Sequence, residues 1–269
     1  MYEEQEDSMS SLKEIQALQL QSEKVFDYFE EICAIPHGSR NTKAISDYLV
    51  AFAKKHDLTW YQDESNNVVI VQEATAGYEQ ADTIILQGHM DMVCEKANGC
   101  AIDFEKDGLD LYVDGDFLKA RGTTLGGDDG IAVAYALAVL DAKDLSHPAL
   151  EVVLTVCEEV GLLGASAMDF SDLEGRLLIN IDSEEEGVLT AGCTGGRRAE
   201  CHLPVTRTAL TGTAVKADIL GLQGGHSGTE IHKGRANAVA LLGRYLTLLE
   251  DHGAAYAVQS ISGGAKENV

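Results

Sequence analysis

Four short segments of this sequence carry histidine or acidic side chains at places where a strand ends or where a glycine turn precedes a helix. They contain His89 with Asp91, Asp128 with Asp129, Glu158 with Glu159, and Asp182. Imidazole and carboxylate groups bind zinc, cobalt and manganese. Residues two apart on a strand share a face, so Asp91 can orient His89, as carboxylates beside histidine ligands commonly do. If the four segments meet in space, they would form a metal site.

Taken one at a time, each segment also has an ordinary structural interpretation. A strand histidine can be a core residue held by one hydrogen bond, and an aspartate ahead of a helix can be a simple N-cap. Glutamate pairs are common in solvated loops, and an aspartate after a strand often belongs to a turn. However, carboxylates about 4 Å apart at an effective dielectric of about 20 repel each other by on the order of 4 kcal/mol. A cation beside Glu158 and Glu159 would remove this repulsion and leave one glutamate free as a base.

The surrounding elements are expected to bring the acidic segments together. The apolar runs 83–87, 152–156 and 177–181 predict strands that are covered on both faces, and each run leads into an acidic segment. Other elements are predicted from their periodicity: helices over 11–33, 41–56 and 130–142, a strand over 66–73, and an acidic loop with a hairpin over 102–120. This alternation indicates an α/β fold with a mixed, mainly parallel sheet between helices, and ligands of such sheets gather where strands end.

A change of pattern near residue 190 predicts a domain boundary. Residues 1–190 would form the first domain, and residues 191–269 would form a smaller α+β domain that is incomplete here. The second domain is expected to contain strands over 199–206, 213–222 and 255–262 and a helix over 235–251. This order predicts a small sheet with one helix on one side.

The composition excludes several classes of protein. Of the 269 residues, 45% are hydrophobic and 24% are charged, which is ordinary for a globular protein. The 44 acidic and 20 basic residues give a net charge of −24, which disfavours nucleic-acid and anionic-membrane partners. No apolar run approaches about 18 residues, and the acidic N-terminus is unlike a signal peptide. The six cysteines form no CxxC pair and are interpreted as reduced thiols. These features fit a cytoplasmic protein.

Several motifs carry a resemblance to a known family. GHMDMVCEK, TTLGGDDGIAVA, TVCEEVGLLGA and INIDSEEEG resemble the motifs of the co-catalytic zinc peptidases of the aminoacylase and carboxypeptidase superfamily. They are most similar to those of the aminoacyl-histidine (Xaa-His) dipeptidases. The resemblance runs from about Phe26 to the last residue and includes EICAIPHGSRNTKAISDYLV and GLQGGHSGTEIHKGRANA. No GxSxG, GxxxxGK[ST] or strand-linked GxGxxG motif points to another chemistry.

This resemblance implies two divalent metal ions, with zinc expected and cobalt or manganese as alternatives. His89 and Asp182 would bind one ion, Glu159 would bind the other, and Asp128 would bridge both. The peptide bond between Asp128 and Asp129 would be cis, as in such enzymes.

The resemblance also implies how the remaining residues act. Glu158 would be the general base in the hydrolysis of dipeptides of the Xaa-His type, and Asp91 would orient His89. His226, in the GGHSG loop of the second domain, would bind the substrate and stabilise the developing oxyanion. The first domain would be the metallopeptidase catalytic domain and the second a lid and dimerisation domain, so a small peptide substrate and a homodimer are expected. In dimeric relatives, the histidine that corresponds to His226 can come from the neighbouring subunit.

One departure from the family pattern concerns the C-terminal end. The family completes its second metal site with a distal histidine, whereas this chain ends at Val269 inside the expected second domain. We therefore expect an N-terminal fragment whose metal site lacks one ligand. Two alternatives remain open: a tripeptidase or N-acyl amino acid amidohydrolase of the same superfamily, and a non-catalytic metal-binding or dimerising fragment.

Overall fold

The computed structural model describes residues 23–183, 185–192, 195, 199–209, 211–224 and 230–263. The chain divides into two units, Met1–Cys193 and Thr194–Val269. The first unit carries the four acidic segments and is the one that builds the candidate site. The part of the predicted first helix before residue 23 lies outside the described residues.

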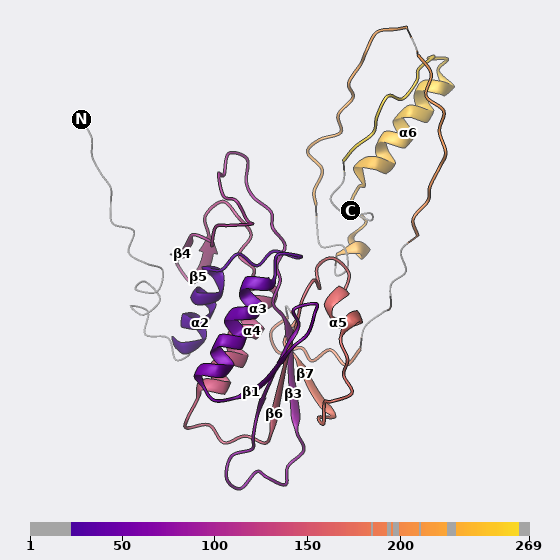
Figure 1. The fold of residues 1–269 in the computed structure, drawn as a ribbon. Coiled ribbons are helices and arrows are strands. Elements are labelled where there is room, and N and C mark those ends of the chain that lie inside the picture. Colours follow the sequence, from indigo (N-terminus) through magenta and orange to yellow (C-terminus); the bar gives the residue numbers. More distant parts are fainter. Residues whose placement is uncertain are drawn as a thin grey trace, which may run out of the picture. The chain divides into compact units, whose positions relative to one another are not determined.

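A five-stranded sheet forms the centre of the first unit (Figure 1). Its strand order is β1 (Thr59–Gln62), β2 (Val68–Gln72), β6 (Leu150–Thr155), β3 (Ile84–His89) and β7 (Leu177–Asn180). Strands β6, β3 and β7 run parallel, while β2 is antiparallel to both β1 and β6. The predicted mixed, mainly parallel sheet is confirmed. The carboxyl ends of β3, β6 and β7 consequently lie at the same edge.

Helices cover one face of this sheet and build the main core. They are α2 (Glu23–Cys33), α3 (Lys43–Lys55) and α4 (Gly127–Asp141). Helix α4 is apolar nearly all round, and it packs against both α2 and β3 with Val133 and Leu137 fully buried. On the other face, Met168 and Leu173 pack against Ile85 and Val153. Both residues follow the short helix α5 (Leu163–Ala167) in the sequence. This packing fixes β3 and the start of α4 relative to each other.

The acidic loop ends in the predicted hairpin, which consists of β4 (Leu111–Asp114) and β5 (Phe117–Ala120). Asp114 pairs with Phe117 across the turn, where Gly115 has a φ of 61°. A glycine suits this left-handed conformation because it has no Cβ.

The prediction that 177–181 forms a strand covered on both faces was wrong. Strand β7 forms, but Leu177 is 54% exposed and Ile179 is 44% exposed. The reason is its position: β7 pairs with β3 on one side and is an edge strand of the described sheet. An apolar run alone does not distinguish an edge strand from a central one. Strand β1 and helix α5 were not predicted, and β1 is a short and largely exposed element.

In the second unit the predicted helix is confirmed as α6 (Ala238–Asp251), which follows the short 3-10 helix η1 (Ile231–Lys233). The side chain of Asn237 caps α6 by accepting a hydrogen bond from the Ala240 amide. The strands predicted over 199–206, 213–222 and 255–262 were wrong, because these residues have no strand conformation. Alternating apolar residues form a strand only where a neighbour pairs with them, and here Leu203 and Val215 are 84% and 86% exposed.

Acidification is expected to destabilise the first unit partly through His56, the residue that follows α3 as its C-cap. Its ring stacks on Phe52 with centroids 4.3 Å apart, and its Nδ1 lies 3.5 Å from Asp141 Oδ1. Burial lowers the pKa of His56, an effect that Asp141 only partly offsets. The unfolded chain therefore binds protons at a higher pH than the folded chain. The unfolding free energy contributed by this residue should fall as the pH drops below about 6.5.

Urea unfolding at pH 7.5 and pH 5.5 measures this effect. The loss of stability on acidification should be smaller in His56→Gln than in the wild-type chain. His202→Gln, at a histidine whose side chain is 83% exposed, is the control and should follow the wild type. An equal acid-induced loss in His56→Gln and the wild type would show that His56 does not contribute.

Candidate metal centre

His89 is the last residue of β3 and is 1% exposed. Gly88 before it allows α4 to approach the strand, because a Cβ at this position would lie 2.7 Å from Ala132 Cβ and from Asp129 Oδ2. His89 Nδ1 lies 2.8 Å from the backbone oxygen of Asp91. This contact requires a proton on Nδ1, which donates to the carbonyl. Nε2 is therefore the ring atom with a free electron pair for a cation.

The pair Asp128 and Asp129 forms the non-helical beginning of α4. Gly126 before it adopts a φ of +71°, a left-handed conformation that favours glycine. The peptide bond between the two aspartates is cis, as expected. Asp128 Oδ1 lies 2.9 Å from His89 Nε2, and Asp129 Oδ2 accepts a hydrogen bond of 3.2 Å from the His89 amide. The glycine turn thus brings both carboxylates to the end of β3.

The other acidic segments arrive from the two neighbouring strands. Glu158 and Glu159 follow β6, and Asp182 follows β7. Glu158 Oε2 lies 3.9 Å from His89 Nε2, and Asp182 Oδ2 lies 4.0 Å from the same atom. The parallel arrangement of the strands is what delivers these side chains to one place.

Among the residues that the structure describes, two sets of three have potential ligand atoms that all lie within 4.8 Å of one another. One set is His89, Asp128 and Glu159, and the other is His89, Asp129 and Asp182. Glu158 lies beside them and belongs to neither set. The donors are one imidazole and several carboxylates, a combination that suits zinc, cobalt and manganese.

Asp91 lies next to this group of side chains and is 1% exposed. Its Oδ2 accepts a hydrogen bond of 2.7 Å from Ser39 Oγ, and its Oδ1 accepts one of 3.0 Å from the Glu158 amide. Burial would raise the pKa of Asp91, but the hydrogen bonds from His89, Ser39 and the Glu158 amide hold it below its ordinary value. Asp91 is therefore an ionised, buried carboxylate that links the end of β3 to the end of β6.

The imidazole at the centre of the cluster is strongly influenced by its acidic neighbours. Burial would lower the pKa of His89, but hydrogen bonds to Asp128 and Asp91 raise it to about 11. The acidic neighbours thus stabilise positive charge at the His89 ring.

The carboxylates oppose one another's ionisation. Burial, with the charge of Asp182, raises the pKa of Asp129 to about 7. Burial, with the charge of Asp128, raises the pKa of Glu159 to about 7, and burial also raises that of Glu158. Acids that are held this close together are stabilised by a cation. The donor set and its charge therefore fit a divalent metal ion.

The structure brings together six of the seven residues that the sequence singled out for the site. They are His89, Asp91, Asp128, Glu158, Glu159 and Asp182. His226 lies outside the described residues. Sequence reasoning gave no role to Asp129, although its position beside Asp128 in a glycine turn was a signal. It also overlooked Ser39, which lies in the quoted motif EICAIPHGSRNTKAISDYLV.

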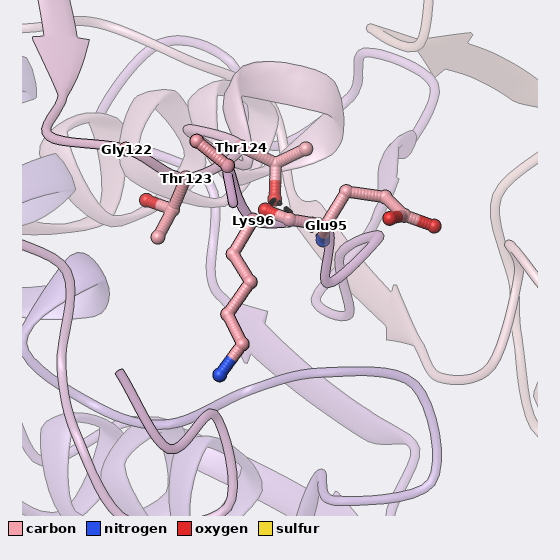
Figure 2. Close-up of a pocket in the computed structure, with 6 residues that line it drawn as sticks. Glu95, Lys96, Gly122, Thr123 and Thr124 are labelled. Atoms are coloured by element: carbon pink, nitrogen blue, oxygen red, sulfur yellow. Dashed lines mark hydrogen bonds between the residues drawn. The ribbon is translucent and has the colours of Figure 1, made fainter. Parts of the chain in front are cut away.

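A separate shallow hollow of about 410 Å³ lies next to the hairpin (Figure 2). Its lining comes from two segments that pair at Lys96 and Thr123: Glu95, Lys96, Ala97, Gly122, Thr123 and Thr124. Lys96 Nζ donates to the backbone oxygen of Ile102. None of the predicted site residues lines this hollow.

Comparison with known proteins gives a family match for the part of the chain that carries this site. Residues 85–196, which span β3, the glycine turn, β6 and β7, match the model of Peptidase family M20/M25/M40. This part of the chain is therefore similar to the peptidases of that family.

Particular relatives extend the match beyond this domain. The chain is 44% identical over 230 residues, 85% of its length, to the cytosol non-specific dipeptidase of Escherichia coli K12. It matches the crystal structure of aminoacylhistidine dipeptidase from Vibrio alginolyticus with a TM-score of 0.64 and 37% identity over 84% of its length. The expected resemblance to aminoacyl-histidine dipeptidases is confirmed.

A tripeptidase from Staphylococcus aureus shares the fold, with a TM-score of 0.51 and 24% identity over 60% of this chain and 43% of that one. The chain spans about half the length of its relatives, 47% of both the Escherichia coli protein and the Vibrio alginolyticus structure.

Removal of Asp128 tests the metal assignment. The wild-type chain is expected to bind Zn²⁺ in a calorimetric titration, and saturating metal should raise its thermal unfolding temperature because metal binds the folded state. Asp128→Ala should weaken binding by at least about tenfold, since it removes a carboxylate 2.9 Å from His89 Nε2.

Asp114→Ala is the matched control, because Asp114 is an exposed aspartate of the same unit that pairs with Lys119. It should leave the zinc isotherm unchanged. An Asp128→Ala isotherm equal to that of the wild type would contradict the assignment.

Proposed function

We propose that this chain carries the metal-dependent active site of a dipeptidase that hydrolyses dipeptides of the Xaa-His type. The observation that carries the proposal is the convergence of four side chains. His89, Glu159 and Asp182 come from the ends of parallel strands, Asp128 comes from the glycine turn, and Glu158 lies beside them. The identity to the Escherichia coli dipeptidase and the likeness to the Vibrio alginolyticus enzyme support the substrate class.

The proposed metal ligands are His89 and Asp182 for one ion, Glu159 for the other, and Asp128 between them. The position of Asp128 supports a shared role, since its donor atom lies within 4.8 Å of those of both His89 and Glu159. The ions are proposed to be zinc, with cobalt or manganese as alternatives. When bound, such ions supply Lewis acidity, which lowers the pKa of a water molecule and polarises a peptide carbonyl.

Glu158 is proposed as the general base. Its side chain is partly exposed, and its backbone amide is anchored on Asp91 at 3.0 Å. Burial and the neighbouring acids raise its pKa, so its carboxylate is a better proton acceptor than an exposed glutamate. Glu158 would take a proton from the attacking water and deliver it to the leaving amine. No covalent bond between the peptide and the chain is needed.

Three further features are proposed on the resemblance alone. His226 would bind the substrate and stabilise the oxyanion, the second unit would act as a lid and dimerisation domain, and the protein would form a homodimer. These proposals require no nucleic-acid or membrane partner.

The proposed location is the cytoplasm, which the name of the Escherichia coli relative supports. In the described residues, none of the helices combines the length and apolar content that a bilayer span requires.

Glu158→Gln separates chemistry from metal binding. The variant should lose hydrolysis of unblocked Xaa-His dipeptides by a factor of about 10² to 10⁴, because glutamine cannot accept the water's proton. Its zinc content, measured by elemental analysis, should stay at the wild-type value. Glu174→Gln changes an exposed glutamate of the same unit and should retain both properties.

The choice of substrates distinguishes the alternatives. Faster turnover of tripeptides or N-acyl amino acids than of dipeptides would favour the alternative of a tripeptidase or an N-acyl amino acid amidohydrolase. Zinc binding by the wild-type chain without turnover of any of these substrates would favour a non-catalytic metal-binding fragment. Full activity in Glu158→Gln would contradict the proposed base.

A further inference from the structure

The segment between α2 and α3, residues 35–41, runs alongside the residues that follow β3. The Met92 amide donates to the His37 carbonyl at 3.2 Å, and the Ser39 amide donates to the Met92 carbonyl at 3.3 Å. Gly38 forms an isolated parallel bridge with Met92. The segment is thereby held next to Asp91, the residue directly before Met92.

This segment also contacts the other strand end and the glycine turn. The Arg40 amide lies 3.3 Å from Cys157 Sγ, directly before Glu158. His37 is 3% exposed and packs under the turn, since a Cβ at Gly126 would lie 3.4 Å from its Nε2. One segment far from the site in sequence therefore contacts three of the four segments that form the cluster.

The contact that acts on the cluster most directly is made by the Ser39 hydroxyl. Ser39 Oγ donates to Asp91 Oδ2 at 2.7 Å, while Asp91 Oδ1 faces the Glu158 amide at 3.0 Å and His89 Nδ1 at 3.5 Å. A carboxylate has two oxygens in a rigid plane, so a bond that fixes Oδ2 also fixes Oδ1. The hydroxyl thus sets the orientation of a side chain that accepts a hydrogen bond from the Glu158 amide and lies beside the imidazole.

We propose that Ser39 is a positioning residue of the active site: its hydroxyl locks the Asp91 carboxylate, and Asp91 in turn places the His89 ring for metal binding and Glu158 for proton transfer. The part of this inference that concerns metal rests on the proposed function. The part that concerns the Asp91 carboxylate and the Glu158 amide holds in the metal-free chain. Outer hydrogen-bond partners of metal ligands typically change metal affinity by about 10- to 100-fold when they are removed.

The test uses Ser39→Ala, Ser39→Thr and the matched control Ser46→Ala. Ser46 is a fully buried serine of α3 whose hydroxyl donates to the Asn66 carbonyl at 2.8 Å, so its loss removes a hydrogen bond that does not touch Asp91. Each variant is measured in two ways: hydrogen–deuterium exchange of the Glu158 amide in the metal-free chain, and a Zn²⁺ titration by calorimetry.

Ser39→Ala is expected to speed exchange of the Glu158 amide several-fold and to raise the zinc dissociation constant by about tenfold. Ser39→Thr should restore both values, because threonine keeps the hydroxyl. Ser46→Ala should lower thermal stability without moving either readout.

The two measurements separate the failure of this inference from the failure of the proposed function. Exchange and zinc affinity in Ser39→Ala that equal those of Ser46→Ala would overturn the positioning role, even if the wild type binds zinc. Absence of zinc binding in the wild type would overturn the proposed function. Faster exchange of the Glu158 amide in Ser39→Ala alone would still support the role of the hydroxyl.

Discussion

The candidate site depends on one electrostatic constraint: several carboxylates are held around a single imidazole at the edge where the parallel strands of the sheet end. Burial, together with the charges of neighbouring carboxylates, raises the pKa of Asp129 and that of Glu159 to about 7. The raised pKa of His89 has the same origin, because burial would otherwise keep its ring neutral. Divalent cations offset the negative charge of such a cluster while its carboxylates stay ionised. This is why the chemistry of the cluster points to a metal.

The rest of the first unit holds this repulsive arrangement in place. Strands β3, β6 and β7 end at the same edge, and the glycine turn before α4 brings two more carboxylates to it. Packing of α4 against α2 and β3 resists the separation that repulsion would otherwise drive. Asp91 then joins two strand ends through hydrogen bonds, and the segment between α2 and α3 holds Asp91. Core packing and polar contacts thus have different tasks: the first places the backbone, and the second orients the side chains.

Much of this arrangement could be predicted from residue types and spacing. Continuous apolar runs predicted β3 and β6, and the acids after them predicted where ligands would gather. The exposure of β7 could not be predicted in the same way. An apolar run does not indicate whether a strand has neighbours on both sides or lies at the edge of the sheet. Two features depend on backbone positions far apart in sequence: the short distance between the Asp129 and Asp182 carboxylates, and the hydrogen bond from Ser39 to Asp91. The strands expected in the second unit failed for a related reason, since alternation specifies a face but not a partner strand.

Anomalous diffraction at the zinc absorption edge, from crystals of this chain soaked in zinc, tests the central claim most directly. We expect anomalous density for two ions. Within about 2.0–2.2 Å, one should have His89 Nε2 and an Asp182 oxygen and the other a Glu159 oxygen, with Asp128 close to both and Glu158 bound to neither. Zinc bound only at other surfaces, or coordinated by Glu158 while Asp128 points away, would contradict the central claim.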